Sequence, residues 1–90
     1  MTHEARTSLA AAEIFAAATQ FFAERVPHTA AFPEREGPGF LTLRGQGGEE
    51  IAIAVVDEGG ARRVRASTLF FDQAVSRFLH ALPAAGPVAA

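Results

Sequence analysis

The sequence contains no cysteine, no lysine, no tryptophan and no tyrosine, and the first two absences exclude whole classes of chemistry. A chain without cysteine forms no disulfide, no thiolate zinc site and no cysteine nucleophile. A chain without lysine has neither a Walker-type phosphate loop nor a lysine Schiff base. All eight positive charges are therefore arginines.

Long apolar runs and a strong charge of either sign are also absent. The net charge of −2 argues against broad electrostatic binding to nucleic acid. No uncharged apolar run reaches the roughly 18 residues of a membrane-spanning helix. The N-terminal residues His3, Glu4 and Arg6 make a poor signal peptide. We therefore expect a cytoplasmic protein with no membrane partner.

Ninety residues are enough for one domain, which we expect to cover residues 1–83, followed by a flexible tail over 84–90. Apolar residues make up 49% of the chain, but 20 of them are alanines. Only 24 residues are valine, isoleucine, leucine, methionine or phenylalanine, so the core must be small.

The first third of the chain predicts one helix and then a loop. The alanine-rich stretch from Thr2 or Thr7 to Val26 favours a helix that Pro27 ends. Residues 27–39 contain three of the five prolines and predict a loop, which Phe32 would pin to the core.

Three strands are predicted over 40–44, 50–56 and 62–68, joined by two glycine-containing hairpins. A two-residue turn at Gly59–Gly60 and a three-residue loop over 46–48 give both hairpins one common inner face, because a one-residue slip would turn every side chain over. The expected inner face consists of Leu41, Leu43, Ile51, Ile53, Val55, Val64 and Ala66. The expected outer face consists of Phe40, Thr42, Arg44, Glu50, Ala52, Ala54, Val56, Arg63, Arg65 and Ser67.

A second helix is predicted from Leu69 or Asp72 to Leu82, because apolar residues recur there at helical spacing and Pro83 follows. The predicted fold is α+β. It is a two-layer sandwich of α-β-β-β-α order, in which a three-stranded antiparallel meander has two helices on one face.

No residue constellation in the sequence predicts catalysis, a cofactor or a metal site. The three histidines lie far apart in the sequence, and no serine lies in a nucleophile-elbow motif. We therefore expect no enzyme. Ser67 and Thr68, where a strand enters a helix beside Arg65, could hold an anion, but helix capping is the simpler role.

The phenylalanine doublets predict association. Adjacent helical positions point about 100° apart, so Phe21 and Phe22 do not both face one sheet, and the pair at 70 and 71 poses the same problem. The spare aromatics favour an interface made by Ile14, Phe15, Phe21, Phe22 and Phe70. The preferred function is a non-catalytic interaction module that forms a homodimer or joins a larger assembly with another protein.

The predicted element order resembles the YbaB-type nucleoid-associated dimers and the Alu-domain proteins of the signal recognition particle. That resemblance implies a small dimer that binds nucleic acid. The alternative function is therefore nucleic-acid binding by the outer sheet face, with Arg44, Arg63 and Arg65 on phosphates.

Overall fold

The computed structural model describes residues 1–24 and 30–84, which form five strands and two helices. In chain order these are β1 (Thr2–Thr7), α1 (Ala11–Glu24), β2 (Ala31–Gly37), β3 (Phe40–Gly45), β4 (Glu50–Glu58), β5 (Ala61–Thr68) and α2 (Asp72–Ala81). The predicted end of the first helix at Val26, the start of the predicted loop with His28, and the tail from residue 85 onward lie outside the described residues.

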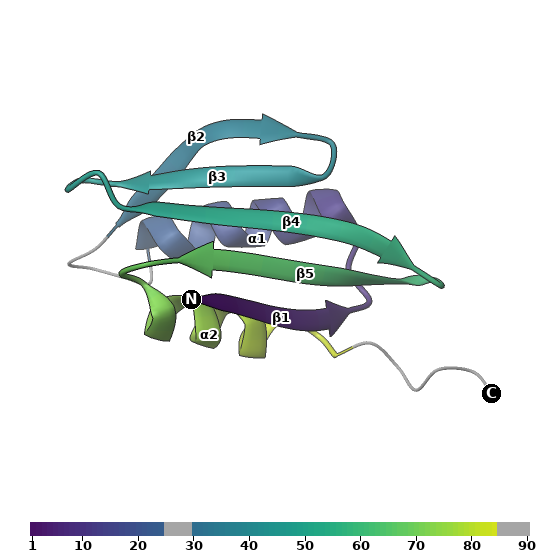
Figure 1. The fold of residues 1–90 in the computed structure, drawn as a ribbon. Helices are drawn as coiled ribbons and strands as arrows, with labels where there is room; N and C mark the ends of the chain where they lie inside the picture. The colour runs from purple at the N-terminus through teal and green to yellow at the C-terminus, as the bar shows by residue number, and fades with distance from the viewer. Residues whose placement is uncertain (25–29, 85–90) are drawn as a thin grey trace.

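The five strands form one antiparallel sheet of order β1-β5-β4-β3-β2, and both helices lie against the same face of it (Figure 1). The predicted α+β class and the antiparallel sheet with two helices are confirmed. The predicted three-stranded meander and the α-β-β-β-α order are wrong, because one strand is added at each edge. The order-based resemblance to the two nucleic-acid-binding families is lost with them.

The two central hairpins have the predicted register. Leu43 pairs with Ile51 in the first hairpin, and Val55 pairs with Val64 in the second. Gly59 and Gly60 both have positive φ, as a tight two-residue turn requires, and Gly48 has positive φ in the three-residue loop. The predicted inner face is buried except for Val55, which is half-buried.

The N-terminal segment is strand β1 and not the start of a helix. Its side chains alternate between exposed and partly or fully buried, and it pairs with β5 from Thr2↔Ser67 to Thr7↔Arg62. Pairing satisfies backbone groups that would otherwise lie open along β5. Helix α1 begins only at Ala11, where the Glu13 carboxylate accepts a hydrogen bond from the N–H of Ala10 at 3.0 Å.

Residues 31–37 form edge strand β2 where the sequence predicted a loop. Proline is tolerated on an edge strand because its missing N–H faces away from the sheet, and the register shifts between Pro33 and Arg35. Phe32 pairs with Arg44 on the outer side and is 51% exposed, so its predicted role in pinning a loop to the core is also wrong.

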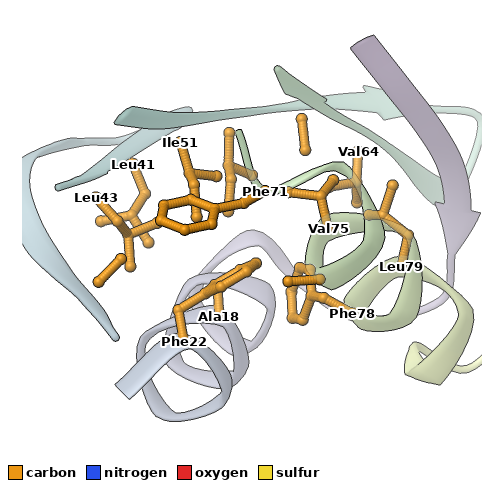
Figure 2. Close-up of a cluster of buried hydrophobic side chains, with 14 of the residues drawn as sticks. Ala18, Phe22, Leu41, Leu43, Ile51, Val64, Phe71, Val75, Phe78 and Leu79 are labelled. Atoms are coloured by element: carbon orange, nitrogen blue, oxygen red, sulfur yellow. The ribbon is translucent and has the colours of Figure 1, made fainter. Parts of the chain in front are cut away.

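The core lies between the inner face of the sheet and both helices (Figure 2). Phe22 from α1 and Phe78 from α2 meet with ring centroids 5.5 Å apart, and Phe21 lies against both rings. The second ring of the first doublet is therefore covered by α2. The sheet and α2 together cover more of the surface of α1 than the sheet alone would.

The second doublet gives a matched pair of substitutions. Phe71 is 6% exposed, whereas its neighbour Phe70 is 72% exposed. Phe71→Ala is expected to lower the free energy of unfolding by about 3–5 kcal/mol through the cavity it leaves. Phe70→Ala is expected to change it by no more than about 0.5 kcal/mol. Urea unfolding at a protein concentration too low for self-association measures both, and similar losses for the two variants would contradict the packing described here.

Candidate interaction face

Neither of the two helices formed by the described residues lies against the second face of the sheet, which we call the open face. Seen in Figure 1, helix α1 lies behind the sheet and the open face is turned to the viewer. The strand register gives its members as Phe32 and Arg35 on β2, Phe40, Thr42 and Arg44 on β3, Glu50, Ala52, Ala54 and Val56 on β4, Arg63, Arg65 and Ser67 on β5, and Thr2, Glu4 and Arg6 on β1.

The β2–β3–β4 side of the open face carries three exposed apolar side chains beside the charged residues Arg35, Arg44 and Glu50. Phe32, Phe40 and Val56 are 51%, 44% and 59% exposed. Ala54 stands beside Phe40 and next to Val56 on the outer side of β4, whereas Arg35 and Thr42 stand between Phe40 and Phe32. Exposed aromatic side chains on a flat, small-residue background are typical of a surface that another molecule covers.

Phe40 lies flat across its neighbour on β2. A Cβ added at Gly37 would lie 2.2 Å from Cε1 of the Phe40 ring, so only glycine leaves room for the ring there. The ring thus extends the apolar surface from β3 onto the edge strand.

The β5–β1 side of the open face carries arginines that are paired with carboxylates. Arg63 lies 2.7 Å from Glu58, Arg6 lies 3.3 Å from the same carboxylate, and Arg65 lies 3.9 Å from Glu4. The structure brings Arg44, Arg63 and Arg65 to one face, as the sequence predicted. It also gives each of them an acidic partner, which leaves little free positive charge for phosphate contacts.

Arg44 is the centre of a small ion-pair cluster at one end of the open face. Its Nη2 donates to Glu34 Oε1 at 2.9 Å and to Glu50 Oε2 at 3.2 Å, its Nε also donates to Glu34, and its Nη1 donates to the carbonyl of Gly48. The hydrogen bond from Arg44 lowers the pKa of Glu34, and the same contact raises the pKa of Arg44. The cluster joins β2, β3 and β4 across the sheet.

A hollow of about 410 Å³ opens beside this cluster, on the β5–β1 side of β4. Exposed Met1, Leu69 and Phe70 form its apolar wall, and Glu50, Ala52 and Ser67 belong to its lining. The open face therefore has apolar side chains at its surface on one side and a hollow with an apolar wall on the other.

The predicted interface residues lie in three different environments. Ile14, Phe15 and Phe22 are buried in the core of a single chain, Phe21 is half-buried between the helices, and only Phe70 is fully exposed.

The hydroxyls considered for an anion site are engaged within the chain. Thr68 Oγ1 accepts from the backbone N–H groups of Phe70 and Phe71 at 3.4 and 3.2 Å. Ser67 Oγ lies 3.0 Å from Thr2 Oγ1. Thr68 thus stabilises the turn before α2, and Ser67 links β5 to β1. The N-cap of α2 is Phe71, which makes no side-chain capping hydrogen bond, so the predicted capping of the helix by Ser67 or Thr68 is wrong.

His3 and His80 both line a smaller hollow of about 140 Å³ between β1 and α2. The sequence analysis did not bring these two histidines together. His3 Nε2 lies 2.9 Å from Asp72 Oδ1, and His80 Nδ1 lies 2.8 Å from the carbonyl of Ser76 one turn before it. Within residues 1–24 and 30–84, no group of three or more histidine or carboxylate side chains is placed to hold a metal ion.

The sequence analysis overlooked the apolar role of Phe32 and Val56. The signal for Val56 was present in the alternation of β4, which places it outward. Phe32 had no such signal, because the predicted loop left it without a strand partner.

Comparison with protein-family models, with curated proteins and with solved structures finds no match to this chain. None of the helices in the described part of the chain is both long and apolar enough to span a membrane. The choice of the open face as the candidate site therefore rests on the geometry of this chain.

The contact between Gly37 and Phe40 predicts that the effect of Gly37→Ala on the free energy of unfolding changes sign when Phe40 is replaced by alanine. Gly37→Ala is expected to displace the Phe40 ring and to lower the free energy of unfolding, because the added Cβ overlaps the ring. In a Phe40→Ala background the same substitution is expected to raise it by about 0.4–1 kcal/mol, since alanine restricts the unfolded chain. Chemical unfolding of the four proteins measures the cycle, and equal effects in both backgrounds would sink the idea.

The Arg44 cluster predicts the titration of Glu34. Because its pKa is lowered in the folded state, its contribution to stability is present above the unfolded value of about 4.3 and is lost as pH falls through the lowered pKa. An NMR titration of the Glu34 side-chain carboxyl should show a midpoint below the ordinary value. Arg44→Gln should raise that midpoint, whereas Arg62→Gln, which removes the partner of Asp57, should not. An unchanged midpoint in Arg44→Gln would be inconsistent with the pairing.

Proposed function

We propose that the protein is a non-catalytic interaction module that works as a homodimer. The observation that carries this proposal is the open face, which is a full side of a five-stranded sheet with exposed Phe32, Phe40 and Val56. Burial of such side chains is favourable by about 25 cal/mol for each Å² removed from water.

The paired charges of the open face support association with a protein surface. Burying an unpaired charge is costly, but Arg44, Arg63 and Arg65 each keep a carboxylate partner within the chain. Covering this face therefore leaves none of these three arginines without a counter-charge.

The protection of both sheet edges also supports association through a face. Edge strand β2 has Pro33 and an irregular register, and Thr7 near the end of β1 is already bridged by Ala84. These features discourage the addition of a further strand.

The proposal predicts a particle of about twice the 9.5 kDa chain mass. Light scattering coupled to size exclusion at tens of micromolar protein measures it, and dilution should shift the particle towards the monomer by mass action. A strict monomer throughout that range would refute the homodimer.

Nucleic-acid binding by the same face is the alternative, and a salt titration separates the two. If Arg44, Arg63 and Arg65 contact phosphates, log affinity should fall steeply with log salt concentration. Fluorescence anisotropy with a labelled oligonucleotide measures the slope. Dimerisation without oligonucleotide binding at low salt supports the interaction module.

A further inference from the structure

The exposed side chain of Phe32 and the hollow of about 410 Å³ lie at the same end of the sheet, on opposite sides of β4. Phe32 pairs with Arg44, and Arg44 pairs with Glu50 at the start of β4. The hollow begins at Glu50 and extends to Met1, Leu69 and Phe70 on the other side. A rotation that exchanges the two sides of β4 therefore brings one feature over the other.

We infer that two copies of the chain pack open face to open face about a two-fold axis along β4, so that Phe32 of each copy enters the hollow of the other. This inference rests on the proposed function and adds the surface and its register. Strand β2 of one copy then lies over β1 of the second, and β3 lies over β5, because the strand order places these pairs at equal distances from β4.

The chemistry of the facing positions agrees with this arrangement. Phe40 and Arg65 stand in one row of the sheet on either side of Ala54, so each Phe40 ring meets the Arg65 guanidinium of the second copy. A guanidinium over an aromatic ring is a favourable contact. On the axis itself, the four outer residues of β4 meet their own counterparts: Glu50, Ala52, Ala54 and Val56. Ala52 and Ala54 are small enough for close approach, and each Glu50 keeps Arg44 of its own chain as a counter-charge.

The size of the open face favours a second copy over a short peptide. Five strands about 4.8 Å apart and about 20 Å long present roughly 500 Å² of plane, and a stable interface buries about 800 Å² on each partner. The whole face and the wall formed by Met1, Leu69 and Phe70 are needed to approach that value. Only another broad, flat surface covers both, and this chain provides one.

The competing surface for a second copy is the apolar groove of about 220 Å³ between the helices, where Phe21 lies beside Phe78 and Ala81. A matched pair of substitutions distinguishes the two. Val56→Lys places a charge on the two-fold axis of the open face, and Ala81→Lys places the same charge at an exposed position of the groove. Val56→Thr keeps the branched side chain without the charge.

The experiment is sedimentation velocity on the wild-type chain, Val56→Lys, Phe32→Asp, Val56→Thr and Ala81→Lys, with circular dichroism to monitor the fold. We expect Val56→Lys and Phe32→Asp to raise the dimer dissociation constant by about 100-fold or more. Val56→Thr and Ala81→Lys should dimerise within a few-fold of the wild type. This result supports the open-face dimer.

A second measurement, cross-linking, tests the same interface without introducing a charge, so it remains informative if a charged variant does not fold. The chain has no cysteine, so Val56→Cys and Ala81→Cys each introduce a single thiol. A short bismaleimide cross-linker should join two copies at position 56 and not at position 81. Cross-linking at 81 alone, or dissociation by Ala81→Lys alone, overturns the inference and leaves the homodimer standing. A wild-type monomer refutes the proposed function and the inference together.

Discussion

The pairing of β1 with β5 is the constraint on which the rest of the architecture depends. It places the first strand at one edge of the sheet, while β2 lies at the other edge, so the connection between them must pass along the sheet. Helix α1 makes that passage on one face, and α2 follows β5 onto the same face (Figure 1). With both helices on one side, the opposite face stays uncovered by the described residues.

This arrangement divides the aromatic side chains between core and surface. The two helices lie side by side, so Phe22 is buried and Phe21 is half-buried against Phe78. The aromatics that remain exposed are Phe32, Phe40 and Phe70. The case for association therefore moves from the helical layer to the sheet.

The charges of the open face follow from strand register. Cross-strand neighbours on one face lie about 5 Å apart, which is within reach of an arginine and a glutamate side chain. Register brings Arg44 opposite Glu50 and Arg65 opposite Glu4. Four of the five arginines on this face, Arg6, Arg44, Arg63 and Arg65, thus form ion pairs, and exposed pairs of this kind contribute little stability. Their main consequence is that another surface can cover them without isolating a charge.

The sequence by itself determined the two central hairpins, their register, the inner face and α2. Glycine turns and period-two alternation act over a few residues, so local physics was enough to align Leu43 with Ile51 and Val55 with Val64. Only the tertiary structure decided that residues 2–7 and 31–37 are strands. Residues 2–7 pair with β5 near the other end of the chain, whereas residues 31–37 pair with the adjacent β3 but contain Pro33 and a register shift, which interrupt the alternation typical of a strand. The open face and its hollow also depend on the tertiary structure. Phe32, Val56 and Leu69 lie on one surface only when all five strands are assembled into the sheet.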